Sequence, residues 1–324
     1  MAWNEILPMP FQSTMRDGES LMGFVLRMAN ANEVQGIHWL YQKLGRDKLN
    51  HFKFEDCFAI ARTFGIPLAH IEQTMWRRRF VDGTSVNSLG SIKITKPYLI
   101  RPLRPQICGQ CLHEYGYCRL TWDFQFVCAC EEHHCPLIDC CPQCLRYLQW
   151  MRPLLLTCNC GFSWRCINPE KQTPDSPTVR LASLFWHKVR LNKSSFAPLD
   201  SFEQILEELS VDAISKLIWI FGFKEHADSH IGTGHSQKIW RTKQASLCVE
   251  RGYLRLRSFI FDFGTEASSN VLDSINFPAL KAFTQDTDTA PDSRFSERLI
   301  REINHRSDGK YHIANGRKRQ HHLF

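Results

Sequence analysis

Cysteines dominate one segment of this chain. Of its 14 cysteines, 12 lie between Cys108 and Cys166, within 59 positions. Random use of cysteine in protein cores does not produce such a concentration. In a reducing compartment, a dense group of thiols binds a metal more often than it forms disulfides. The segment therefore predicts metal ligation.

The spacing of these residues fits two structural zinc sites. Zn²⁺ in such sites takes four Cys or His ligands in a tetrahedron, and two close pairs commonly supply them. The first pattern is C-x2-C-x18-C-x2-H and the second is C-x2-C-x13-C-x-C. The predicted ligands are Cys108, Cys111, Cys130 and His133 for one site, and Cys141, Cys144, Cys158 and Cys160 for the other. We expect two Zn²⁺ ions per chain.

The other thiols of the segment leave further assignments open. They are Cys118, Cys128, Cys135, Cys140 and Cys166. Cys128 and Cys140 can each replace a neighbouring cysteine ligand, and His134 can replace His133, although the proline turn of "CPQC" favours the second site as written. One zinc ion, an iron–sulfur cluster and a set of buried free thiols are the alternative interpretations.

The same motifs argue against catalysis at the metal. A hydrolytic zinc keeps one coordination position for water, whereas four thiolate or imidazole ligands fill the shell. The sequence lacks H-E-x-x-H, the deaminase signature and a G-x-x-x-x-G-K-[ST] phosphate loop, and "GTGHS" from Gly232 is interpreted as a flexible loop. No grouping of acidic residues localises a two-metal nuclease site. We therefore expect a protein that is not an enzyme.

Helices are expected to precede the cysteine-rich segment. Apolar spacing predicts them over residues 20–31, 37–45 and 54–64, and Pro67 opens a fourth that continues to about residue 79. A glycine at position 65 separates the last two, so the pair resembles a helix-turn-helix that reads DNA or docks on a protein.

Three consecutive arginines end the fourth predicted helix. Arg77, Arg78 and Arg79 fall in its last turn, where cations interact favourably with the helix dipole. We interpret them as nucleic-acid-binding or partner-binding residues, with a solvated helix end as the alternative.

The chain becomes helical again beyond the cysteines. Residues 168–178 are polar and rich in proline, which predicts a linker, and apolar stripes predict helices near residues 202–209, 214–221 and 295–303. Ser210 is a candidate cap, and the tail from Asn315 is basic. The expected fold is mainly α. An N-terminal helix-turn-helix domain (1–100) precedes a double zinc-knuckle or zinc-ribbon domain (101–168) and a C-terminal helical domain (169–324).

Composition sets broad limits on function. The net charge of +7 and the pI near 8.7 are mildly basic, well below the charge density of a histone-like protein. No stretch approaches the roughly 18 apolar residues needed to cross a bilayer, and the N-terminus lacks the features of a signal peptide. We expect an intracellular protein with no membrane partner.

Together, these motifs resemble the TniQ/TnsD family of transposition proteins. The family pattern is C-x-x-C, a spacer with tryptophan, C-x-x-H, an apolar turn, C-P-x-C and C-x-C-G. Here it reads "CGQC", "YGYCRLTWDFQFVC", "CEEH", "PLID", "CPQC" and "CNCG", and the opening "PMPFQSTMRDGESLMGFVLRMANAN" is also similar to the family's opening. The resemblance implies the same eight zinc ligands, while Cys128, Cys135 and Cys140 depart from the pattern.

The resemblance also implies a role. Members select the transposition target and connect it to the AAA+ ATPase TnsC and the transposase, without catalysing a reaction. Medium-length members act as homodimers on a CRISPR Cascade complex with its crRNA, and long members bind a fixed DNA site. At 324 residues, this chain is expected to be a Cascade-guided adaptor in the bacterial cytoplasm, acting on target DNA. The alternative is a target selector that binds a specific DNA sequence directly.

Overall fold

The computed structural model describes residues 7–46, 52–81, 84–190, 199–226, 240–261, 271–287 and 289–306. Two compact units make up the chain. Unit 1 is Met1–Ser195 with Gln237–Ser246, and unit 2 is Phe196–Ser236 with Leu247–Phe324. Helices form most of the regular structure, beside one small three-stranded sheet. The division into three domains stays a prediction. The "GTGHS" stretch and the basic tail lie outside the described residues.

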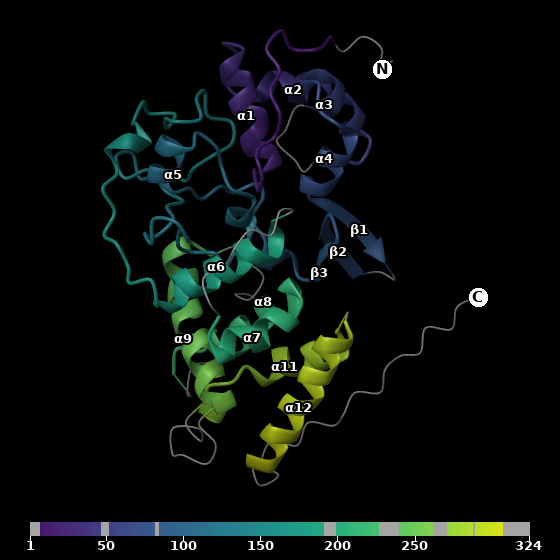
Figure 1. Cartoon of the computed structure of the whole chain (residues 1–324), viewed down its shortest axis with the longest axis vertical. Coiled ribbons are helices and arrows are strands. Elements are labelled where there is room, and N and C mark those ends of the chain that lie inside the picture. Colours follow the sequence, from purple (N-terminus) through teal and green to yellow (C-terminus); the bar gives the residue numbers. More distant parts are fainter. Residues whose placement is uncertain are drawn as a thin grey trace, which may run out of the picture. The chain divides into compact units, whose positions relative to one another are not determined.

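Four short helices open unit 1: α1 (Leu21–Ala31), α2 (His38–Lys43), α3 (Asp56–Phe64) and α4 (Leu68–Thr74) (Figure 1). The Ser20 hydroxyl caps α1 by accepting a hydrogen bond from the Gly23 N–H at 3.1 Å. Gly65 ends α3 with a left-handed φ of 65°. The rings of Phe24 and Phe64, both fully buried, meet edge to face. The first three helices predicted from the periodicity are therefore confirmed.

The predicted end of the fourth helix is wrong. Helix α4 ends at Thr74, and Arg77, Arg78 and Arg79 lie in strand β1 (Arg77–Val81) instead of a last helical turn. The cause is long-range. Met75 is extended, and both it and Trp76 are buried, with the Trp76 indole N–H donating to Asp123 Oδ2 at 3.0 Å. This anchor pulls the chain out of the helix and into the sheet.

The sheet is antiparallel and has the order β1-β2-β3, with β2 at Thr84–Leu89 and β3 at Ile92–Ile94 (Figure 1). Strand β1 is therefore an edge strand. Leu89 and Ile94 are buried on one face, whereas Arg79 and Lys93, on the other face, are exposed. The sheet thus exposes the basic side chains of Arg79 and Lys93 to solvent.

Regular structure is sparse in the cysteine-rich part of unit 1. It holds α5 (Gly109–Glu114) and the 3-10 helices η2 (Pro97–Leu99), η3 (Leu120–Asp123) and η4 (Trp164–Cys166), joined by isolated antiparallel bridges. Buried tryptophans supply much of its core, and the indole N–H of Trp150 donates to the Pro102 carbonyl at 2.7 Å.

Helix α6 (Pro177–Val189) follows this part of the chain. It begins inside the stretch 168–178 predicted as a linker, because Pro177 occupies a first-turn position that suits proline. The Phe185 ring on α6 packs on Phe124, with ring centres 5.3 Å apart. Helix α6 therefore contributes to the core of unit 1.

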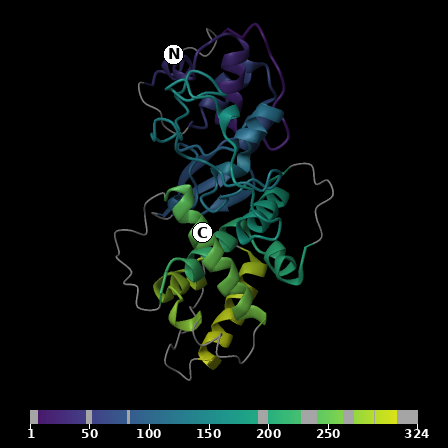
Figure 2. The ribbon, with the colours of Figure 1, turned by 90° about the vertical axis from the view of Figure 1, so that its left-hand side faces the viewer.

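Unit 2 is helical. It contains α7 (Ser201–Glu208), α8 (Val211–Gly222), α11 (Phe277–Gln285), α12 (Ala290–Arg306) and all but the first turn of α9 (Thr242–Phe261), drawn from teal-green to yellow in Figure 2. Ser210 caps α8 through the Ala213 N–H, as predicted. The predictions near 202–209, 214–221 and 295–303 are confirmed, whereas α9 and α11 were not predicted.

Two glycines let α8 and α9 touch backbone to backbone. A Cβ built on Gly252 would lie 2.4 Å from the Ile218 carbonyl oxygen, and one on Gly222 would lie 2.1 Å from the Cys248 carbonyl oxygen. Real Cβ atoms do not approach an oxygen so closely. Any side chain at either position must therefore push the two helices apart.

Replacing Gly252 by alanine should destabilise the protein. In an exposed helix this change gains up to about 1 kcal/mol, but overpacking should reverse the sign and lower the free energy of unfolding by about 1–3 kcal/mol. Urea denaturation measures the difference. Leu254→Ala, on the exposed side of α9, should change little. A Gly252→Ala variant as stable as the parent would show that the helices can separate without cost.

Candidate metal centres

The first ligand group converges on one point in unit 1. The ligand atoms of Cys108, Cys111, Cys130 and His133 all lie within 4.8 Å of one another. Cys111 Sγ is 3.4 Å from Cys130 Sγ and 3.2 Å from His133 Nδ1. Ligands of one tetrahedral zinc are separated by about 3.3 to 3.8 Å, given the usual Zn–S and Zn–N lengths. The donor set and its spacing therefore fit a structural metal ion.

Local backbone geometry positions each half of this group. Cys108 is the N-cap of α5, and its Sγ accepts the Cys111 N–H at 3.4 Å. The other half repeats the arrangement, because Cys130 Sγ accepts the His133 N–H at 3.4 Å. These N–H···S contacts hold both sulfurs in place beside the other ligand atoms of the group.

The His133 ring is held by a second contact. Its Nε2 lies 2.9 Å from Glu114 Oε2, at the end of α5. A hydrogen on Nε2 that is donated to this carboxylate leaves Nδ1 as the free acceptor facing the thiols. The contact therefore selects the tautomer that can ligate.

The second group is made of thiols alone. The sulfurs of Cys141, Cys144, Cys158 and Cys160 lie within 4.8 Å of one another, with Cys141 Sγ 3.7 Å from Cys160 Sγ. Isolated bridges between Cys140 and Tyr147 and between residues 157 and 163 close the two loops that carry them.

Ionisation differs within this second group. The Arg146 backbone lowers the pKa of Cys144 to about 6, whereas burial raises that of Cys158 to about 12. A cation at the centre would neutralise four thiolates that otherwise repel one another. The chemistry of this group therefore also fits a metal such as zinc.

Three of the four ligand pairs are followed by a residue in the left-handed backbone conformation. The next residue, His134, Leu145 or Gly161, has a φ of 51°, 58° or 86°. Each donates its N–H to the carbonyl of the first ligand in its pair, at 2.9–3.0 Å. This left-handed conformation suits glycine, yet two of the three turns use a side chain with a Cβ. The backbone is strained at those two positions.

The remaining cysteines have other surroundings. Cys128 Sγ lies 3.6 Å from the Gln125 carbonyl oxygen, and Cys118 is buried, with burial raising its pKa to about 12. Cys135 Sγ lies 3.6 Å from Cys108 Sγ, so it is a fifth thiol beside the first group. The structure thus brings together the eight predicted residues, while the identity of the ligands stays a prediction.

A buried network that spacing did not predict adjoins the second group. Arg101 donates to Asp139 Oδ2 at 3.0 Å, and the Thr242 N–H donates to the same oxygen at 2.9 Å. Although burial opposes the shift, Arg101 and Thr242 lower the pKa of Asp139. Thr242 is 103 positions from Asp139, so no local pattern could have revealed the contact. The network fixes the start of α9 to the knuckle region.

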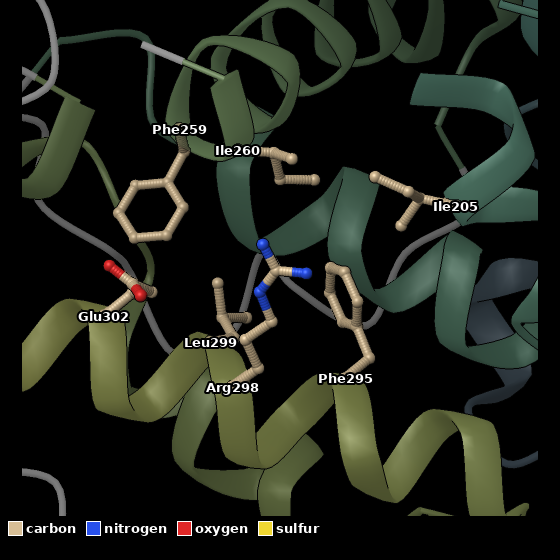
Figure 3. Close-up of a pocket in the computed structure, with 7 residues that line it drawn as sticks. All are labelled: Ile205, Phe259, Ile260, Phe295, Arg298, Leu299 and Glu302. Atoms are coloured by element: carbon tan, nitrogen blue, oxygen red, sulfur yellow. The ribbon is translucent and has the colours of Figure 1, made fainter. Parts of the chain in front are cut away.

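Unit 2 contains a hollow with a mostly apolar lining. It has an empty volume of about 340 Å³ and is lined by Ile205, Phe259, Ile260, Phe295, Arg298, Leu299 and Glu302 (Figure 3). Only two of these side chains carry charge, and none is a Ser, Cys or His that could serve as a nucleophile or soft metal ligand. We assign it no chemistry.

Among the described residues, no helix is both long and apolar enough to cross a membrane.

Comparison with known families finds one match. Residues 10–137 match the model of the TniQ family. The matched range includes α1 to α5, the sheet and all four residues of the first ligand group, and it ends before the second group. A comparison with curated proteins finds no match. The family match supports a relationship of this part of the chain to TniQ proteins.

Metal analysis of the purified chain should find two zinc equivalents, one for each group. Cys111→Ser should lose one and Cys158→Ser the other, because each removes one of four ligands. Cys135→Ser and Cys166→Ser are matched controls that should retain both. Elemental analysis by mass spectrometry gives the stoichiometry. Loss of metal in Cys135→Ser would move the fifth thiol into the ligand set.

Leu145→Gly should stabilise the second knuckle. The leucine is exposed and has a left-handed φ, so glycine removes strain of about 1 kcal/mol or more without removing buried contacts. We expect a higher free energy of unfolding in urea at saturating zinc. Leu145→Ala is the control, because it keeps the Cβ and should gain little. Equal effects of the two substitutions would mean that the backbone is not strained.

Proposed function

We propose that this chain is a non-catalytic target-selection adaptor of a transposon. It binds an RNA-guided Cascade complex as a homodimer, and it recruits the AAA+ regulator TnsC and the transposase to target DNA. The observation that carries the proposal is the TniQ match over residues 10–137, together with a first ligand group that lies wholly within it.

The architecture of the cysteine-rich part supports a role in binding other proteins. Filled four-ligand metal sites stabilise loops that bury too little apolar surface to fold alone, and they leave no coordination position for a substrate. Several apolar side chains of this part remain exposed: Leu145, Tyr147 and Leu154. Exposed apolar groups on a rigid scaffold are typical of surfaces that bind other proteins.

The exposed face of α4 also favours protein docking. Leu68, Ala69, His70 and Gln73 form it, and it has no Lys or Arg. A helix that enters the major groove usually combines base-reading side chains with cations that contact phosphates. The α3–Gly65–α4 pair retains the order of a helix-turn-helix, which keeps direct sequence-specific DNA binding as the alternative function.

Co-expression with a crRNA-loaded Cascade tests the proposal. Size-exclusion chromatography at moderate salt should recover two copies of the chain with each Cascade complex. Leu68→Asp should weaken co-elution by placing a negative charge on the exposed face of α4, while Leu247→Asp, at a similarly exposed position in unit 2, should not. A chain that elutes alone and shifts one specific duplex would instead support the direct DNA-binding function.

A further inference from the structure

The solvent-exposed face of the three-stranded sheet carries basic side chains from strands β1 and β3. Side chains alternate along β1, so Arg77 and Arg79 share one face. The register pairs Arg77 with Ser88 and Ser88 with Lys93, which places Lys93 on that face too. Arg79 and Lys93 are exposed, and Arg77 is partly exposed.

Aromatic rings adjoin these cations. The Arg77 guanidinium lies 4.9 Å from the centre of the Phe54 ring, and Phe58 is four positions further along the chain, in the first turn of α3. Both rings are more than half exposed. We call the five residues Phe54, Phe58, Arg77, Arg79 and Lys93 the aromatic–basic surface.

Basic residues outnumber acidic residues around the aromatic–basic surface. Among the described residues, the acidic neighbours are Glu72, with a carboxylate oxygen 3.9 Å from Arg77, Glu55, which lies between Phe54 and α3, and Asp56, which forms an ion pair with Arg46. Lys53 is also exposed beside Phe54. Apart from the Asp56–Arg46 pair, the described residues here include four cations and two carboxylates, and this positive balance favours an anionic partner.

We propose that the aromatic–basic surface binds a single strand of nucleic acid. Arg79 and Lys93 contact phosphates, and Phe54 and Phe58 stack on bases. A phenyl ring gains nothing from a phosphate and cannot reach the faces of bases that are stacked inside a duplex, whereas an unpaired strand offers both phosphates and free base faces. This inference goes beyond the proposed function, which requires no contact between this chain and nucleic acid.

Fluorescence anisotropy of the full chain tests the inference. The probes are a labelled thymidine oligonucleotide, a uridine oligonucleotide of equal length and a mixed-sequence duplex of that length. We expect at least one single strand to bind about tenfold more tightly than the duplex. Comparing the two single strands shows whether the surface prefers DNA or RNA.

Two double variants separate the stacking and charge contributions. Phe54→Ala/Phe58→Ala should weaken single-strand binding at least about fivefold per ring. Arg79→Gln/Lys93→Gln should reduce the slope of log affinity against log salt by about 1.4, the value for two phosphate contacts on a single strand. The matched controls are Phe11→Ala and Arg165→Gln/Lys171→Gln, which alter exposed residues of unit 1 outside the surface.

Several outcomes would overturn the inference. They are equal or tighter binding of the duplex, no binding of either single strand, and unchanged affinity in the phenylalanine variant. Loss of Cascade co-elution in that variant without loss of strand binding would assign the surface to a protein. Because wild-type co-elution with Cascade is measured separately, failure of strand binding leaves the proposed function intact.

Discussion

Two groups of four Cys or His side chains, each meeting around one point, constrain the conformation of the middle of this chain. Between residues 108 and 160, the polypeptide has one short helix and one 3-10 helix, joined by isolated bridges. Holding such loops in one conformation costs conformational entropy. Eight donor atoms drawn into two clusters of less than 4.8 Å remove that freedom when metal binds. The buried tryptophans pack around these loops.

Other parts of unit 1 depend on this constraint. Asp139 lies two residues before Cys141, and its carboxylate holds both the Arg101 guanidinium and the Thr242 backbone. A buried charge pair is costly unless its geometry is well defined. The ordered loop before Cys141 supplies that geometry, and the first turn of α9 is thereby fixed to the region of the second ligand group.

The sequence contained the local features of the fold but few of the distant ones. Periodicity and capping residues such as Gly65 and Ser210 located most helices, because these signals act within a few residues. The pairwise spacing of Cys and His identified the two clusters for the same reason. The error at Arg77 arose because Asp123, 47 positions beyond Trp76, decides where α4 ends. The close approach of α8 and α9 at Gly222 and Gly252 and the Asp139 network also depend on tertiary neighbours.

The position of β1 at the edge of its sheet has a consequence for self-association. An edge strand offers unpaired backbone groups to any similar strand, and identical chains often join through such edges. A two-fold pairing of β1 with its own copy would bring the arginines of the two strands together without any acidic residue on either strand to offset them. Like charges opposed across a strand pair are destabilising. Pairing of β1 with a second copy of itself is therefore disfavoured by the charge of the strand.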